Sequence, residues 1–207
     1  MLKRTFLLLS LVLLLAACGG GRYRETFDNR LSWNVNGNNG VSGGVNDGEF
    51  ILSVDFPGSM FWTTAGRRNL GNGTFEVEAQ VVSGSSETAY GLVFRAEDSA
   101  RDFYYFLISS DGYYSIGGCK EECVDNKFIP IAPEMWILTD KITPHTNARH
   151  NLRVIADGSD LAYYIDGVEV GRFRDTTLAA GDIGLFVQTF DSGATVAFDN
   201  LSFTPSD

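Results

Sequence analysis

The chain has 207 residues, 44% of them hydrophobic, which is enough apolar sequence for one domain with a sizeable core. Its 26 acidic residues outnumber 16 basic ones, and the formal net charge is −10. Such a surface repels nucleic acid and anionic lipid headgroups, so the composition argues against polyanion binding and predicts no nucleic-acid partner.

The first predicted segment is a signal peptide over residues 1–17. Lys3 and Arg4 precede the apolar run FLLLSLVLLLAA, which is short for a membrane-spanning helix. The sequence Leu-Ala-Ala-Cys that follows this run resembles the bacterial lipobox, which implies that Cys18 is lipidated. The alternatives are an uncleaved anchor helix and an ordinary secretory signal with a chance cysteine. Each of them places the rest of the chain outside the cytoplasm, and the lipid anchor would attach it to a bacterial membrane, at the cell surface or the periplasmic face.

Residues 18–25 are predicted to be the lipidated cysteine and a flexible tether, because three glycines follow Cys18. Residues 26–207 then form one domain with no long helical periodicity and many short apolar segments punctuated by Gly, Asn and Asp. The strands predicted from these segments are 49–55, 74–82, 89–96, 102–109, 113–118, 150–156, 161–166, 168–174, 182–190 and 194–203. Short strands with tight turns predict an all-β fold, a sandwich of two antiparallel sheets.

The segment FYYFLIS at 103–109 is apolar on both faces, which is typical of a central strand with one face in the core. Its other face would be covered by loops or would line a groove. A two-residue turn at Asp111-Gly112 is expected to pair Ser110 with Tyr113. That pairing predicts that Tyr104 and Tyr113 share one face.

Two further cysteines, Cys119 and Cys123, lie close together in GGCKEECVDNK. In an oxidising compartment a local disulfide is the simplest interpretation. A metal site needs more ligands than this pair, and the two histidines of the chain lie in a separate segment.

Four segments carry a family resemblance: YGLVFR, FYYFLISSDGYYSI, NLRVIADGSDLAYYIDGVEVGRF and GDIGLFVQTFDSGATVAFDNLSF. Their succession resembles the concanavalin A-like lectin/glucanase superfamily, and most of all its laminin-G-like and 3-keto-disaccharide hydrolase-type domains. The resemblance implies a jelly roll in which the first strand (ETFDN) lies beside the last (VAFDNLSFT). Its motifs are structural, and functions in this superfamily include lectins, glycosidases and interaction modules, so the fold alone does not decide.

Aromatic side chains are the main candidates for ligand binding, since sugars stack their C–H faces on such rings. The candidate ligand-binding set is Arg95, Tyr104, Tyr113, Trp62 and Trp136. The competing interpretation is that these aromatic residues fill the core and that Arg95 pairs with a nearby acid.

Evidence for catalysis is weaker, and no catalytic residue is assigned. Glycosidases of this superfamily carry E-x-D-x-E on a strand, and the corresponding residues here are Glu76, Glu78 and Gln80, whose amide cannot exchange a proton. Calcium would suit the oxygens of Asp28-Asn29 and Asp199-Asn200, but turn-forming roles explain these pairs equally well. No metal ligand is therefore assigned, and no other cofactor is expected.

The sequence thus predicts a lipid-anchored, extracytoplasmic, lectin-like module whose partner is a carbohydrate or cell-surface polymer. Two alternatives stay open. One is a glycoside-active enzyme of the 3-keto-disaccharide hydrolase type, and the other is a laminin-G-like protein-interaction or structural module.

Overall fold

Hydrogen-bonded strands make up nearly all the regular structure of the chain. The computed structural model describes residues 21–29, 33–35, 40–66, 68–97, 100–145 and 147–206. The predicted signal peptide and Cys18 lie outside the described residues. Among the residues within those ranges, no helix has the length and hydropathy needed to cross a membrane.

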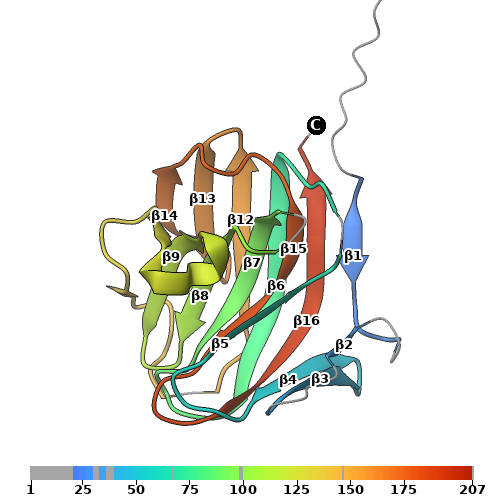
Figure 1. The fold of residues 1–207 in the computed structure, drawn as a ribbon, viewed down its shortest axis with the longest axis vertical. Coiled ribbons are helices and arrows are strands. Elements are labelled where there is room, and N and C mark those ends of the chain that lie inside the picture. Colours follow the sequence, from blue (N-terminus) through green and yellow to red (C-terminus); the bar gives the residue numbers. More distant parts are fainter. Residues whose placement is uncertain are drawn as a thin grey trace, which may run out of the picture.

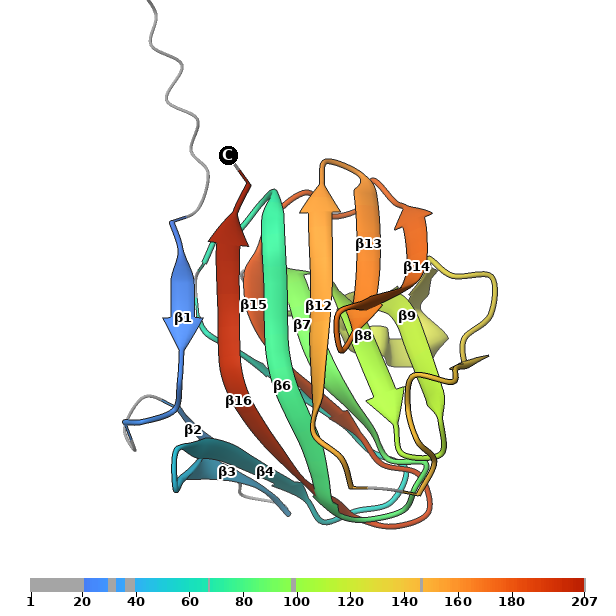
Figure 2. The ribbon, with the colours of Figure 1, turned by 180° about the vertical axis from the view of Figure 1, so that it is seen from behind.

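One layer of the fold is a nine-stranded antiparallel sheet, counted over the described residues. Its strands follow the order β14-β13-β12-β6-β16-β4-β3-β2, and β1 pairs with β16 beside this path. Figure 2 shows this sheet in front, with β6 and β16 as its long central strands. The bounds are β1 (Tyr23–Glu25), β2 (Asn34–Val35), β3 (Val41–Asn46), β4 (Glu49–Val54), β6 (Gly73–Ser83), β12 (His150–Asp157), β13 (Asp160–Ile165), β14 (Val168–Arg174) and β16 (Ala194–Pro205).

The second layer is a seven-stranded antiparallel sheet, again counted over the described part of the chain. Its order is β10-β9-β8-β7-β15-β5, and β11 pairs with β9. Figure 1 shows this sheet from its outer side, where the 3-10 helix η1 lies in front of β8 and β9. The bounds are β5 (Met60–Thr64), β7 (Ala89–Ala96), β8 (Phe103–Ser109), β9 (Tyr113–Cys119), η1 (Glu121–Asn126), β10 (Phe128–Pro130), β11 (Ile137–Leu138) and β15 (Asp182–Gln188).

The core lies between the two sheets and follows the two-residue period of the strands. In β6 the residues Phe75, Val77 and Ala79 are fully buried, while the glutamates between them are partly exposed. From the facing sheet, Phe94 contacts Phe75 with ring centroids 5.5 Å apart. The fold is therefore the predicted two-sheet sandwich.

All ten predicted strands are present, with boundaries that differ by at most a few residues. The expected pairing of the first strand with the last is also present, because Tyr23–Glu25 pairs with the 201–203 stretch of β16. This first strand overlaps the predicted ETFDN segment only at Glu25 and otherwise lies in the predicted tether. The strands missing from the prediction are β2, β3, β5, β10 and β11, most of which are short or edge strands.

Two of the Asp-Gly turns of the chain differ in geometry. Asp166 and Gly167 form a two-residue turn, since Ile165 pairs with Val168 and both turn residues have positive φ. At Asp111-Gly112 the pairing of Ile108 with Tyr114 leaves three residues in the turn. The predicted two-residue turn there is wrong.

The predicted disulfide between Cys119 and Cys123 is confirmed. It spans the start of η1, in which four non-glycine residues, three of them consecutive, have φ between 50° and 64°. Such left-handed conformations are unfavourable for L-residues, so other interactions must hold the loop. Besides the disulfide, the Glu122 amide donates to the Arg101 carbonyl at 2.8 Å.

We expect the disulfide to stabilise the fold by about 2 kcal/mol, which is the chain-entropy value for so short a loop. The double variant Cys119→Ser, Cys123→Ser, made in a Cys18→Ala chain, should lower the free energy of unfolding by about this amount in urea titration. Thiol titration of the Cys18→Ala chain should find no free thiol in the native state. Two reactive thiols in that chain would contradict the disulfide.

Candidate functional site

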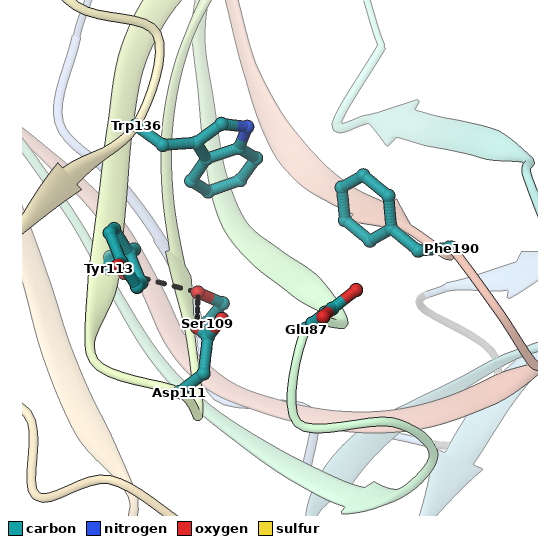
Figure 3. Close-up of a pocket in the computed structure, with 6 residues that line it drawn as sticks. All are labelled: Glu87, Ser109, Asp111, Tyr113, Trp136 and Phe190. Atoms are coloured by element: carbon teal, nitrogen blue, oxygen red, sulfur yellow. Dashed lines mark hydrogen bonds between the residues drawn. The ribbon is translucent and has the colours of Figure 1, made fainter.

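A hollow of about 340 Å³ opens on the outer face of the seven-stranded sheet. It lies beside the turn that joins β8 to β9, and Figure 3 shows the side chains around it. Its lining residues are Glu87, Ser109, Asp111, Tyr113, Trp136 and Phe190. Two of them, Tyr113 and Trp136, belong to the predicted ligand-binding set.

The β8–β9 register brings Ser109 and Tyr113 to the hollow. Ile108 pairs with Tyr114, and the next pair outward is Ser109 with Tyr113, whose side chains lie on the outer face. The Gly112 amide donates to the Ser109 carbonyl at 3.1 Å and closes the three-residue turn. The β8–β9 register therefore differs by one residue from the prediction. As a result Tyr104 lies on the face opposite to that of Tyr113, and its side chain is in the core.

The aromatic wall of the hollow combines two segments that are far apart in sequence. Trp136 directly precedes β11, whose residues Ile137 and Leu138 pair with β9 at Tyr114 and Tyr113. Phe190 follows β15, and its carbonyl accepts a hydrogen bond from the Gly58 amide at 2.8 Å. The Trp136 and Phe190 rings meet at 68° with centroids 6.2 Å apart. Both rings are half-buried, so each has a surface that a ligand can contact.

The polar groups of the hollow come from two loops that are joined to each other. The Asp111 amide donates to the Ser86 carbonyl at 3.0 Å, which fixes the loop carrying Glu87 against the β8–β9 turn. The Ser109 hydroxyl donates to the Asp111 carboxylate and lies 3.4 Å from the Tyr113 carbonyl. The lining residues include no Lys, Arg or His. The lining of the hollow thus combines three aromatic rings, one of them the phenol of Tyr113, with the Ser109 hydroxyl and two carboxylates.

Trp62 lies on the same outer face but does not line the hollow. It packs against Phe103 and Phe186 with ring centroids 5.0 and 5.9 Å away, and its indole Nε1 donates to the Ala100 carbonyl at 2.8 Å. Trp62 extends the outer aromatic cluster in which Trp136 and Phe190 also take part.

Arg95 does not reach the hollow, contrary to the prediction. The β7–β15 pairing is irregular here, and Arg95 has a φ of 49°, so its side chain enters the core and is fully buried. Its guanidinium donates to the carbonyls of Gly158 and Leu178 at 2.9 and 3.1 Å, and to Asn72 Oδ1 at 3.3 Å. Burial lowers the pKa of Arg95. The guanidinium therefore joins three loops rather than binding a ligand.

Tyr104 is the second member of the predicted set that lies in the core. Its hydroxyl donates to Asp175 and accepts a hydrogen bond from the Leu178 amide at 2.8 Å. Burial, together with the bond to Asp175, raises the pKa of Tyr104 to about 12. Its ring is fully buried and packs against Phe94 at 5.3 Å.

The glutamates that resemble a glycosidase motif lie in the other sheet. Glu76 and Glu78 are on β6, on the face opposite to the core, and Glu76 lies 4.0 Å from the guanidinium of Arg153. Gln80 donates to the Asn147 carbonyl at 2.6 Å. This strand contributes nothing to the hollow.

The candidate calcium positions remain without a defined site. Asp199 and Asn200 lie in β16 at a β-bulge, since the register against β6 shifts between Asp199 and Ser202, and the Asp199 carboxylate accepts from the Asn200 amide at 2.6 Å. Within the described residues, no group of three or more His, Cys, Asp and Glu side chains is arranged to hold a metal ion.

Comparison with known proteins gives similarity at the level of structure alone. No protein-family model and no curated protein matches the sequence. Among solved structures, the carbohydrate-binding module CBM66 from Bacillus subtilis is 19% identical, with a TM-score of 0.54, over 87% of this chain and 95% of its own. A β-glucanase of Bacillus licheniformis is 14% identical with a TM-score of 0.61, over 90% and 99% of the two chains.

A third similar structure is the laminarinase catalytic domain from Thermotoga maritima, at 9% identity and a TM-score of 0.62, over 91% of this chain and 99% of its own. The chain has the concanavalin A-like fold. At these identities the likeness shows the fold and leaves the ligand open. The concanavalin A-like fold occurs both in carbohydrate-binding modules and in glycoside hydrolases, and this agrees with the expectation from the sequence.

Four lining residues were not among the sequence-based candidates: Glu87, Ser109, Asp111 and Phe190. Asp111 was interpreted only as a turn former, and Phe190 as the end of a strand. A signal for Phe190 was present in the sequence, since an aromatic residue directly before Asp-Ser-Gly is typical of a strand that ends in an exposed loop.

Two buried tyrosines, Tyr104 and Tyr163, allow a matched test of the hydrogen bonds assigned to their hydroxyls. Tyr104→Phe should lower the free energy of unfolding by about 1–3 kcal/mol, because the buried Leu178 amide loses its acceptor. The hydroxyl of the fully buried Tyr163 has no hydrogen-bond partner within the described structure, so Tyr163→Phe should cost nothing or stabilise the fold. Urea denaturation of both variants makes the comparison. Equal destabilisation by the two substitutions would contradict the assigned hydrogen bonds.

Proposed function

We propose that this protein is a lipid-anchored, extracytoplasmic, lectin-like module that binds carbohydrate in the hollow on the outer face of the seven-stranded sheet. The observation that carries the proposal is the chemistry of the lining: Tyr113, Trp136 and Phe190 beside the oxygens of Ser109, Asp111 and Glu87.

This combination suits a sugar ring. The C–H face of a pyranose stacks on an aromatic ring, while the hydroxyls at its edge donate to carboxylates and exchange hydrogen bonds with a serine hydroxyl. The volume of about 340 Å³ falls in the usual range for small-ligand pockets. The hollow is also formed by residues with fixed positions, since Trp136 is attached through β11 and Asp111 is joined to the Ser86 loop.

The similar structures support the proposal at the level of fold. One of them is named a carbohydrate-binding module and others are named glucanases. Here the two carboxylates of the hollow come from loops and one of them accepts the Ser109 hydroxyl, whereas the E-x-E strand lies in the other sheet. We therefore favour binding over hydrolysis.

The two rival classes have distinct outcomes. A glycoside-active enzyme would release a reducing or oxidised sugar, and the activity would disappear in Glu87→Gln or Asp111→Asn. A laminin-G-like interaction module would bind no glycan and would crosslink to a protein partner at the cell surface.

Trp136→Ala should raise the Kd for a glycan identified on an oligosaccharide array by about tenfold, because the main stacking surface is lost. Tyr164→Ala is the matched control: this partly exposed tyrosine lies on the other sheet, where Arg153 stacks on its ring at 4.6 Å. The Kd of the Tyr164→Ala chain for the same glycan should equal that of the wild-type chain. Absence of any bound glycan, or equal affinity of the Trp136→Ala and wild-type chains, would overturn the proposed site.

The cellular part of the proposal rests on the sequence alone. The basic residues, the apolar run and the Leu-Ala-Ala-Cys ending support a lipid on Cys18, and the disulfide suits an oxidising compartment. The acidic surface does not favour anionic headgroups, so acyl chains would provide the attachment.

Cys18→Ala should move the protein from the membrane fraction to the soluble exported fraction, because the acceptor thiol is missing. Fractionation followed by immunoblotting measures the change, and the Cys119→Ser, Cys123→Ser chain is the control that keeps the anchor. Membrane retention of the Cys18→Ala chain would contradict the lipid anchor.

A further inference from the structure

We propose that the hollow prefers glycans that carry free amino groups, that is, oligosaccharides of de-N-acetylated hexosamine. This inference rests on the proposed function and specifies its ligand class. It starts from the charges of the hollow, whose described lining residues include two carboxylates and no cationic side chain.

The two carboxylates are not neutralised by the protein. Within the described residues neither Glu87 nor Asp111 takes part in a salt bridge. Asp111 accepts only the hydroxyl of Ser109, and Glu87 has an exposed side chain. A protonated sugar amine in the hollow would therefore gain charge-assisted hydrogen bonds without having to displace a competing lysine or arginine.

Other exposed carboxylates of the same chain do have cationic partners. Asp160 pairs with Arg174 at 2.8 Å, and Glu169 pairs with Arg172 at 2.7 Å. The sequence thus places arginines beside acidic residues on the far sheet, but leaves the carboxylates of the hollow without one. A ligand that itself supplies a positive charge would therefore meet no competing cation among the described residues of the hollow.

The aromatic rings favour the same ligand class. An ammonium group near the face of a Trp, Tyr or Phe ring is attracted by its quadrupole, and an aromatic wall beside carboxylates is the usual setting for recognition of ammonium groups. Figure 3 shows the Trp136 and Phe190 rings on one side of the hollow and the Glu87 and Asp111 side chains on the other. An amino sugar would stack one face on the rings while its amine meets the carboxylates.

The same charges disfavour other glycans to different degrees. A uronic acid or another anionic sugar would bring a third negative charge into the hollow with no cation to offset it. A neutral sugar would keep stacking and hydrogen bonds but would gain no ion pair. The expected order of affinity is amino sugar, then neutral sugar, then acidic sugar.

The test compares four tetrasaccharides with the full-length Cys18→Ala chain by calorimetry at a pH that keeps sugar amines protonated. The probes are fully deacetylated chitotetraose, its N-acetylated form, cellotetraose and tetragalacturonate. We expect the deacetylated probe to bind about tenfold or more tightly than the two neutral probes, and the galacturonate to bind least. The affinity for the deacetylated probe should also fall as salt is added, since screening weakens ion pairs.

Glu87→Gln and Asp111→Asn should each remove most of the preference for the deacetylated probe. They should weaken binding of the neutral probes to a smaller extent, because the amide oxygen still accepts a hydrogen bond from a sugar hydroxyl but carries no charge. Asp47→Asn is the charge-matched control. Asp47 is exposed, lies in the β3–β4 turn and has a φ of 51°, which asparagine tolerates well. This control should keep the wild-type preference.

Each outcome decides between the two proposals. Neutral probes that bind as tightly as the deacetylated one, and that lose affinity in Trp136→Ala, would overturn the amino-sugar preference and leave the carbohydrate-binding function standing. Preference for the deacetylated probe that persists in Glu87→Gln and Asp111→Asn would also overturn this inference. Failure of all four probes and of the wider oligosaccharide array would overturn both.

Discussion

The hydrogen-bond register between β8 and β9 decides which side chains of β9 share a face with each set of side chains of β8. Because side chains alternate along a strand, the pairing of Ile108 with Tyr114 places Tyr114 between the sheets, on the same face as Tyr104, Phe106 and Ile108. The other set, Phe103, Tyr105 and Leu107, then lies on the outer face. A slip of one residue between β9 and β8 would turn Tyr113 into the core and Tyr114 outward, and would so remove Tyr113 from the hollow.

The outer face of this strand forms a second, smaller hydrophobic cluster. The chain after β9 returns over it, and Phe128 and Trp136 pack there together with Trp62 from β5. Close approach requires glycine at position 117, where a Cβ would lie 2.6 Å from the hydroxyl oxygen of Tyr105. The segment that covers this face ends beside Trp136, and the hollow lies where Tyr113 is left partly exposed. The outer face of β8 and β9 is therefore both a second core and, at one end, a candidate binding site.

Period-two patterning was enough to predict the strands and the sandwich, because long strands such as β6 and β16 carry strong alternation. The register of a hairpin followed from the sequence only where both residues of an Asp-Gly turn have positive φ, as at Asp166 and Gly167. At the β8–β9 turn Gly112 has positive φ and Asp111 does not. The sequence showed no sign of the irregularity that turns Arg95 inward, because a bulge depends on the neighbouring strand and not on local composition. Strands such as β10 and β11 are too short for a periodic signal, and so the position of Trp136 was not predictable.

The lining of the hollow explains why a shared fold leaves the ligand undetermined. Glu87, Asp111 and Phe190 all belong to loops or strand ends, which vary more easily than the sheet that supports them. The sandwich supplies the relative positions of these loops, since β11 pairs with β9 and the Asp111 amide binds the Ser86 carbonyl. Similar sheets can therefore support different sets of charges and rings at the same end of the fold. Among the described residues of this hollow the set is aromatic and anionic without a cation, and it is this local chemistry, more than the sandwich, that would define which ligand gains from entering it.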